Sequence, residues 1–490
     1  MCPSIKDSPL YPITNPKSIA VFGASNRLTS MGTNLLSSIQ DLGFEGALYP
    51  VHPDETSVLG LRAYQNVLDL PEVPDLAMLV LPTALVPQAL GDCGKMGIRH
   101  AIVVSGGFNE VGGKGFDLQK KVVSIAQKYR IRFLGPNCIG VANPHHKFNS
   151  TFLPFSGVPG FIGMASQSGS FITQLFDYLH RRGLGFSTGI SVGNEADIDI
   201  VDCMRHLAAC PHTRVIALYI EAIRRGRAFI ETARAIVPHK PIVALYVGGS
   251  ETGKQAGFSH TGALAGPDDL YNGVFRQSGV IRACSIEELF DFCMALGTCS
   301  PPTNNRVIIQ THSGGPGAAA ADACGRSGLE LAPLSPETCG RLDAFVPHTG
   351  SMNNPVDITF AKNPMEYFEN IPAILLEEKN ASALLIYFLV PHRSIKRALE
   401  SMGVPADQLD DNIAQLIKAQ CETIIGLQQK YGKPLIGYSF SANRNLLVKE
   451  LMKGGIPVLA SPERAAHALG ALVRYRRLCE KVMRSDGQEI

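Results

Sequence analysis

Short apolar stretches alternate with stretches whose apolar residues recur at helical spacing. Residues 18–23 read as a buried strand that ends in a Gly-rich turn, and residues 31–42 carry an apolar helical face. Further short apolar stretches follow at 47–51, 76–81, 101–104 and 131–135. Strands separated by helical stretches are typical of βαβ units, so this part predicts a parallel sheet.

The same alternation occurs twice more along the chain. One set of strand-like pieces lies at 161–165, 215–220 and 242–247, and another at 306–310, 383–387, 434–438 and 457–459, before a closing helix from about Pro462. Polar stretches at 143–159 and 297–305 read as connections. We therefore predict an α/β chain of three tandem parallel-sheet units, with domains at 1–145, 155–298 and 306–490.

Composition supports this reading and narrows the function. The chain has 490 residues, enough for about three domains, with 45% hydrophobic residues and 48 glycines, as in a globular α/β enzyme. The net charge is +2 without a long basic run, which disfavours nucleic acid as a partner. The 12 cysteines form no Cys-x-x-Cys pair, so free thiols in a reducing compartment are expected.

No targeting or membrane segment is expected. Residues 1–16 lack a signal-peptide pattern, and the apolar runs, such as 77–81, are of strand length. We expect a cytoplasmic protein that does not enter a membrane.

The first candidate site is the turn after the first strand, formed by Gly23, Ala24, Ser25 and Arg27 and followed by Gly32. Small residues there let backbone N–H groups approach a pyrophosphate, and Arg27 adds a charge. A tight turn in any doubly wound fold explains the pattern about as well. No acidic residue is placed after the second strand for a nicotinamide ribose, which disfavours NAD.

The second candidate site is a run of small polar residues between a strand and an amphipathic helix. Its members are Ser166, Gln167, Ser168, Gly169 and Ser170. A helix N-terminus favours an anion, and capping alone needs one serine rather than three. A Gly-x-Ser-x-Gly hydrolase elbow is excluded because serines occupy positions 166 and 170.

Two further residues are candidates for catalysis. His260 lies among small residues after a Gly-rich loop at 248–254, which suits a histidine that must visit two sites. Glu221 ends a strand, where a carboxylate can accept from an imidazole N–H and leave the other nitrogen nucleophilic. A solvated histidine and a surface carboxylate are the alternatives.

Taken in order, these motifs resemble the succinyl-CoA synthetase superfamily, and within it the α subunits of ADP-forming acetyl-CoA synthetases. The segments that carry the resemblance are 21–25, 105–110, 135–140, 166–170, 193–197, 219–221, 259–262, 313–317 and 354–357. The resemblance implies a Rossmann-like CoA-binding domain followed by two flavodoxin-like domains. It covers nearly the whole chain.

The resemblance also implies an activity. Acid, CoA and a nucleoside triphosphate become acyl-CoA, a diphosphate and phosphate, reversibly, through an acyl phosphate and a phosphoryl group on His260. Glu221 orients the ring, and the 166–170 helix start stabilises the phosphohistidine. By the same resemblance, Asn137 and Cys138 form the acyl or carboxylate site, and no metal binds this chain. The implied CoA-binding residues are Gly23, Ala24, Ser25, Arg27, Gly32, Pro53, Leu81, Pro82, Ser105 and Gly106.

The chain departs from the family after the second strand. Family members often have Asn-Pro-Lys where this chain has His52, Pro53 and Asp54. An acid therefore replaces a lysine that could touch a CoA phosphate, and His52 is a candidate to substitute for it in part.

A separate partner is also implied. The chain shows neither an ATP-grasp domain nor a P-loop motif. By resemblance, ATP or ADP and Mg²⁺ bind a separate ATP-grasp β subunit, in a heterotetramer of two α and two β subunits.

Three other functions stay open. They are a non-catalytic acyl-CoA-binding homologue, a dehydrogenase built on the first unit, and a lyase or CoA ligase of the same superfamily that acts on a different acid. The acid itself, the choice between ADP and GDP and the direction of flux are not encoded in recognisable motifs.

Overall fold

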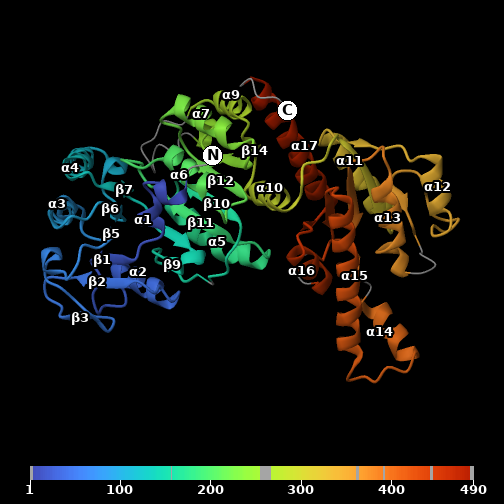
Figure 1. Cartoon of the computed structure of the whole chain (residues 1–490), viewed down its shortest axis with the longest axis horizontal. Helices are drawn as coiled ribbons and strands as arrows, with labels where there is room; N and C mark the ends of the chain where they lie inside the picture. The colour runs from blue at the N-terminus through green and yellow to red at the C-terminus, as the bar shows by residue number, and fades with distance from the viewer. Residues whose placement is uncertain are drawn as a thin grey trace. The chain divides into compact units, whose positions relative to one another are not determined.

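The structure is a computed structural model that describes residues 4–155, 157–253, 266–359, 364–389, 392–441 and 445–485. The chain divides into two compact units, residues 1–284 and 285–490. The first runs from blue to green in Figure 1, and the second from yellow to red.

The first unit opens with a five-stranded parallel sheet in the order β2-β1-β5-β6-β7. Its core is made of buried apolar residues from both the strands and the crossover helices, which is what continuous apolar strands require. A small hairpin, β3 and β4, follows β2. The elements are β1 (Ser18–Phe22), α2 (Met31–Asp41), β2 (Ala47–Val51), β3 (Ser57–Val58), β4 (Leu61–Arg62), β5 (Leu76–Leu79), α3 (Val86–Met96), β6 (His100–Val103), α4 (Lys114–Tyr129) and β7 (Arg132–Leu134).

A second sheet completes this unit, in the order β14-β13-β12-β10-β11-β8-β9. Its parallel strands and helices are β10 (Ile162–Ser166), α5 (Gly169–Arg181), β11 (Phe186–Ser191), α6 (Ile200–Ala209), β12 (Val215–Ile220), α7 (Gly226–Ile236), β13 (Ile242–Tyr246), α9 (Asp268–Ser278) and β14 (Ile281–Ala283).

The stretch 143–159 is more ordered than the connection predicted from the sequence. β8 (Val141–Asn143) pairs antiparallel with β11, and β9 (Phe148–Asn149) pairs with β8, so both strands extend the second sheet. Phe148 is fully buried there. Strands of three and two residues around Pro144 are too short to show a periodic pattern, which is why the sequence did not reveal them.

The second unit contains the third sheet, in the order β16-β15-β18-β19-β20, with β17 beside β15. Its elements are α10 (Ile286–Thr298), β15 (Arg306–Thr311), α11 (Gly314–Arg326), β16 (Glu330–Leu331), α12 (Pro336–Leu342), β17 (Val356–Asp357), α13 (Asn370–Glu377), β18 (Ala383–Tyr387), α14 (His392–Ser401), α15 (Leu409–Tyr431), β19 (Leu435–Tyr438), α16 (Leu446–Lys453), β20 (Val458–Leu459) and α17 (Pro462–Ser485). On α17, Arg464 holds Asp291 of α10 through two hydrogen bonds of 2.7 and 2.8 Å.

The three parallel sheets share one order. If the parallel strands of each sheet are numbered along the chain, with the short strand β17 left aside, all three sheets follow 2-1-3-4-5, one of the two common doubly wound arrangements. The predicted α/β fold class is confirmed. Ligands bind such sheets outside the carboxyl ends of the strands, so these edges are where a site is expected. The domain limits 1–145, 155–298 and 306–490 stay a prediction.

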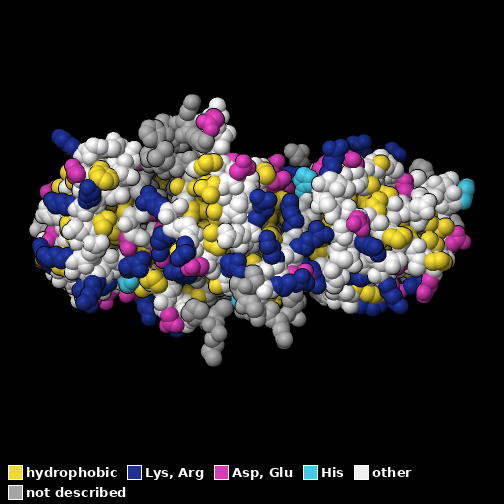
Figure 2. All heavy atoms as spheres, turned by 90° about the horizontal axis from the view of Figure 1, so that it is seen from above, with side chains coloured by type: hydrophobic (Ala, Val, Ile, Leu, Met, Phe, Trp, Pro, Cys, Tyr) yellow, Lys and Arg dark blue, Asp and Glu magenta, His cyan; other side chains and the backbone are white. Residues whose placement is uncertain are grey.

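The surface carries no single field of one charge on the face seen in Figure 2, where basic side chains are scattered among acidic and uncharged ones. Among the described helices, none combines the length and the apolar character needed to cross a bilayer.

The amino-terminal segment is fastened to α6 through one buried histidine. His206 is 1% exposed, and its ring nitrogens lie 2.9 Å from Ser8 Oγ and 3.2 Å from Thr14 Oγ1. Asn143 Nδ2 also donates to the Thr14 carbonyl oxygen, at 2.9 Å. Burial lowers the pKa of His206 to about 4.

We predict that His206 makes the fold acid-sensitive. The unfolded chain binds a proton at this ring near pH 6.5 and the folded chain only near 4, so stability falls as the pH drops through this window. Between pH 7.5 and pH 5 the loss from this group is about 2 kcal/mol. In His206→Gln, whose amide can still bond both hydroxyls, the difference between urea midpoints at the two pH values should shrink. An unchanged difference would contradict this role.

Candidate active site

Most of the sequence motifs in the first unit meet at the carboxyl edges of its two sheets. The turns after β1, β5, β6 and β7 lie at one edge, and those after β10, β12 and β13 lie at the other. The loops 133–137 and 193–198 join the two edges by backbone hydrogen bonds, such as Asn194 N–H to Pro136 O at 2.9 Å and Ala196 N–H to Gly135 O at 3.1 Å.

In the turn after β1, close backbone packing leaves no room for a side chain at Gly23 or at the facing Gly32. Gly23 has φ +85°, and a Cβ there would lie 1.9 Å from the Val80 carbonyl oxygen. A Cβ at Gly32, on α2, would lie 2.3 Å from the Gly23 carbonyl oxygen. Ser25 is tied to this helix, because its N–H donates to Thr33 Oγ1 (3.0 Å) and its carbonyl accepts from the same hydroxyl (2.7 Å). Ala24 is buried and Arg27 is exposed, so Arg27 offers this turn a cation at the surface.

A cavity of about 230 Å³ opens beside this turn. Pro53 and Leu81, both predicted CoA ligands, line it together with Phe22 and Val51. Ser105 holds Leu81 in place, since its hydroxyl donates to Leu81 O (2.6 Å) and accepts from Leu81 N–H (3.0 Å).

The neighbouring loop is also fixed. Gly106 O accepts from Thr83 Oγ1 at 2.5 Å, one residue after Pro82, which precedes the 3₁₀ turn η3 (Thr83–Leu85). The arrangement therefore offers a bare backbone cradle beside a partly apolar pocket, which fits a nucleotide-bearing thiol such as CoA.

In the loop after β2, the ring of His52 is bound to its own backbone. His52 Nδ1 accepts from the N–H groups of Asp54 and Glu55, both at 3.2 Å. Asp54 stands where the family often has a lysine. Asp54 itself is exposed.

The predicted acyl-site residues point in different directions. Asn137 is exposed, with φ +58°, and its Nδ2 donates to Asn194 Oδ1 at 3.3 Å. Cys138 is 2% exposed, its Sγ lies 3.4 Å from Val103 O, and burial raises its pKa to about 12. Only Asn137 therefore presents its side chain at the surface.

The start of α5 has the character expected of an anion site. Ser166 is fully buried and donates to Ser168 O at 2.7 Å, and Ser168, the N-cap residue, makes no capping bond with its side chain. Capping therefore does not account for the serines, and the N–H groups of the first turn keep their affinity for an anion. Gly169 lies against Ile139, because a Cβ there would be 3.3 Å from Ile139 Cγ2. The loop 135–140 thus adjoins the helix start, where Ser170 is exposed.

The side chain of Gln167 bonds neighbouring loops of the chain. Its Oε1 accepts from the N–H groups of Glu221 (2.5 Å) and Ala222 (3.0 Å), and its Nε2 donates to Ala222 O (2.7 Å) and Glu195 Oε2 (2.8 Å). All four hydrogen-bonding positions of the amide are occupied. The side chain therefore holds the backbone after β12, and only the main chain of Gln167 is left for a ligand.

Glu221 lies half-buried at this edge, with its backbone fixed by Gln167. His260 lies outside the described residues. The described residues on either side of its segment are anchored near the end of β13: Gly253 N–H donates to Ser250 Oγ (3.0 Å), and Gly266 O accepts from Tyr246 OH (2.8 Å).

Sequence reasoning passed over one carboxyl group at this edge. Glu195 is 6% exposed and has φ +50°, and it accepts from Gln167 Nε2 and from Ile200 N–H (2.9 Å). Burial raises its pKa to about 7. The segment 193–197 carries part of the family resemblance, but its sequence does not indicate that the Glu195 side chain is buried.

The second unit repeats the helix start. Thr311 Oγ1 donates to Ser313 O at 2.9 Å, and the side chain of Ser313 does not cap α11. Ser166 and Ser168 are arranged in the same way before α5.

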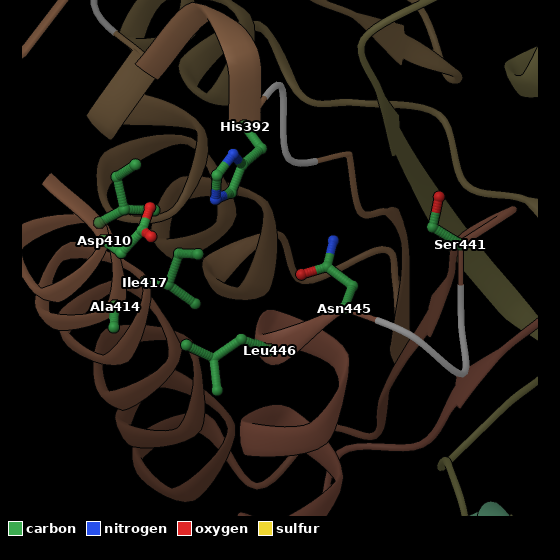
Figure 3. Close-up of a pocket in the computed structure, with 8 residues that line it drawn as sticks. His392, Asp410, Ala414, Ile417, Ser441, Asn445 and Leu446 are labelled. Carbon is green, nitrogen blue, oxygen red and sulfur yellow. The ribbon is translucent and has the colours of Figure 1, made fainter. Parts of the chain in front are cut away.

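A separate cavity of about 370 Å³ lies between α14, α15 and α16, where His392 and Asn445 point toward one another over an apolar floor (Figure 3). The residues that line it are His392, Asp410, Ile413, Ala414, Ile417, Ser441, Asn445 and Leu446.

Comparison with family models gives one match for each sheet. Residues 17–144 match a CoA binding domain, residues 159–296 a succinyl-CoA ligase like flavodoxin domain, and residues 307–417 a ligase-CoA domain.

Curated relatives and solved structures extend over nearly the whole chain. The chain is 36% identical to the acetate–CoA ligase [ADP-forming] II subunit alpha of Pyrococcus furiosus, over 94% of this chain and 97% of the relative. It is 34% identical to the 4-hydroxybutyrate–CoA ligase [ADP-forming] of Nitrosopumilus maritimus, over 95% of this chain but only 64% of that longer relative. The dinucleotide forming acetyl-coenzyme A synthetase 1 of Ca. Korarchaeum cryptofilum, solved with phosphate and ADP, superimposes with a TM-score of 0.85 at 31% identity, over 97% of this chain and 98% of that one.

We predict that the close approach at Gly23 is essential, and Gly60 provides a matched control. Gly60 has φ +81°, nearly that of Gly23, but a Cβ there meets nothing within 4 Å. Gly60→Ala should lower the free energy of unfolding by about 1–2 kcal/mol, from the backbone conformation alone. Gly23→Ala adds the clash and should cost about 2–5 kcal/mol and weaken CoA binding. Urea unfolding and a CoA titration measure both effects, and equal losses in the two variants would contradict the prediction.

Proposed function

The chain belongs to the family of ADP-forming acetate–CoA ligases, which are acid–thiol ligases, and from this membership we propose that it is the CoA-binding, phosphohistidine-carrying subunit of a reversible NDP-forming acyl-CoA synthetase. The observation that carries the proposal is the start of α5. The side chain of Ser168 does not cap this helix start. The helix start lies between the loop 135–140 and the backbone of Glu221.

CoA is the proposed ligand of the first sheet. The turn at Gly23 and Gly32 would receive its phosphates on backbone N–H groups, assisted by Arg27, and the cavity lined by Pro53 and Leu81 would receive an apolar part. Pro82, Ser105 and Gly106 hold the neighbouring loop in place. The match of residues 17–144 to a CoA binding domain supports this assignment.

The reaction runs through two group transfers when acyl-CoA is consumed. A phosphate oxygen attacks the thioester carbon, the C–S bond breaks and CoA leaves as its thiol, which gives an acyl phosphate. A ring nitrogen of His260 then attacks phosphorus, the P–O bond to the acyl group breaks, and the carboxylate leaves. The phosphoryl group passes last to a nucleoside diphosphate, and the histidine is restored.

Positioning and charge account for the catalysis in this proposal. Glu221 accepts from the His260 N–H that does not react, which fixes the tautomer and balances the charge of the phosphorylated ring. The N-terminus of α5, with Ser168, Gly169 and Ser170, stabilises phosphate and then the phosphohistidine. Asn137, at the surface of the adjoining loop, is the proposed contact for the carboxylate of the acid.

A partner subunit is proposed for the nucleotide. We propose that ATP or ADP and Mg²⁺ bind an ATP-grasp β subunit, in an assembly of two α and two β chains. Two facts support this: the Pyrococcus relative is named as a subunit alpha, and the chain spans only 64% of the Nitrosopumilus relative, which therefore has a further region. The acid is not fixed by this argument, because those two relatives are named for acetate and for 4-hydroxybutyrate.

We predict that His260→Asn abolishes phosphorylation while CoA binding is nearly retained. The purified chain is incubated with radiolabelled phosphate and a panel of acyl-CoA esters, alone and with a co-expressed β subunit. Acid-labile, base-stable label on the wild type only is the expected result, and the best ester identifies the acid. Full turnover in the variant would rule out the phosphohistidine, and unlabelled wild type in every condition would point to a non-catalytic acyl-CoA binder.

We predict that Glu221→Gln keeps the fold but slows phosphorylation on the order of a hundredfold, through the loss of one positioned charge. The amide retains the size of the side chain, so the urea midpoint serves as the control. A labelling rate equal to that of the wild type would remove Glu221 from the mechanism.

A further inference from the structure

Two groups of hydrogen bonds, joined by the peptide link between Asn194 and Glu195, connect the loop after β6 with Glu221. Glu110 accepts from Gly107 N–H and from Asn194 Nδ2, both at 2.5 Å. The next residue along the chain, Glu195, accepts from Gln167 Nε2 at 2.8 Å, and Gln167 Oε1 accepts from Glu221 N–H at 2.5 Å. Glu195 is the member of these groups whose carboxyl group contacts Gln167.

Glu195 determines how the Gln167 amide is oriented. A glutamine amide can turn over and exchange its oxygen and nitrogen, but here the oxygen must face the two N–H groups of 221 and 222. The carboxylate of Glu195 accepts only from the nitrogen side, at 2.8 Å, and so it favours the same orientation. Its other oxygen is fixed by Ile200 N–H at 2.9 Å.

In the described part of the chain, both hydrogen-bond partners of this carboxyl group are donors. Gln167 Nε2 and Ile200 N–H contact its two oxygens, and Arg224 Nε lies 3.7 Å from Oε2. Both donors bind a charged carboxylate more strongly than they would bind a neutral carboxyl group. They therefore favour the ionised form, while burial opposes it.

We propose that Glu195 is a positioning residue of the phosphoryl site, which in its ionised form locks the Gln167 amide and through it the backbone that carries Glu221. Its effect on the rate rests on the proposed function, but its effect on the backbone does not. Glu195 is inaccessible to substrate and acts only through Gln167.

Protonation of Glu195 near neutral pH should weaken its contact with the Gln167 amide. Burial is the main cause that raises the pKa of Glu195 to about 7, the Asp199 carboxylate adds to it, and the hydrogen bonds and Arg224 oppose it. The other titratable groups that sense this charge are Tyr271 of α9 and Cys203 of α6. Glu195 is thus placed to lose its charge near neutral pH.

Hydrogen exchange tests the backbone part without any assay of activity. At pH 8 the amides of residues 221 and 222 in Glu195→Gln should exchange about tenfold faster than in the wild type, as for the loss of one hydrogen bond to a charged group. At pH 6 the two proteins should converge. Asp197→Asn is the matched control, because it removes a carboxylate from the same loop that bonds Arg132 and Phe133 N–H but not Gln167. It should leave exchange at 221 and 222 unchanged.

Phosphorylation kinetics test the part that depends on the function. The ratio of the wild-type rate to the Glu195→Gln rate should rise with pH through about 7, and because it is a ratio the titrations of phosphate and of His260 cancel. The KM for acyl-CoA should change little. In a Gln167→Ala background, adding Glu195→Gln should have no further effect.

Equal exchange in wild type and Glu195→Gln at pH 8, or additive effects of the two substitutions, would overturn the proposal. Faster exchange confined to the Glu195 and Gln167 variants supports it. If no variant and no wild type takes up label, the proposed function fails, and the exchange experiment alone decides whether Glu195 holds this backbone.

Discussion

A single amide side chain ties together the parts of the candidate site. Gln167 follows β10, yet its four hydrogen bonds reach the backbone after β12 and the carboxyl group of Glu195 in the loop after β11. Parallel strands do not bond one another beyond their carboxyl ends, so turns at such an edge have no regular partner. Gln167 supplies the missing partner, since it presents an acceptor and a donor to residues 221–222 as a neighbouring strand would. The positions of Glu221 and of the α5 start relative to each other depend on that contact.

The fold class was predictable because its signal is strong and local. Buried parallel strands are continuous apolar runs, and most of the longer strands lie where such runs were found. β11 was missed, although it is six residues long and buried, because serine, threonine and glycine interrupt its apolar run. The missed pieces lack that signal. β8 and β9 are three and two residues long, and the edge strand β16 has only two. Their pairing depends on neighbours distant in the sequence rather than on their own pattern.

The candidate site was predictable in location but not in detail. Small residues after β1 and β10 correctly placed the turns at the sheet edges, because only certain residue types tolerate such turns. Which side chains face a ligand could not be derived. Gln167 and Cys138 both turn away from the surface, and the inward-facing Glu195 has a positive φ that no sequence pattern announces for a glutamate. Direction and burial of this kind arise from tertiary contacts, which a single sequence does not display.

The contact between His206 and the amino-terminal segment also bears on how the protein is made. Thr14 leaves the ribosome 192 residues before its partner His206. At synthesis rates of roughly 5–20 residues per second, that interval is about 10–40 s. During it the first sheet can form from strands already made, and the segment before that sheet can contact β6, but its hydrogen bonds to His206 must wait. A chaperone or protease that scans emerging chains therefore meets Ser8 and Thr14 before His206 can bind them.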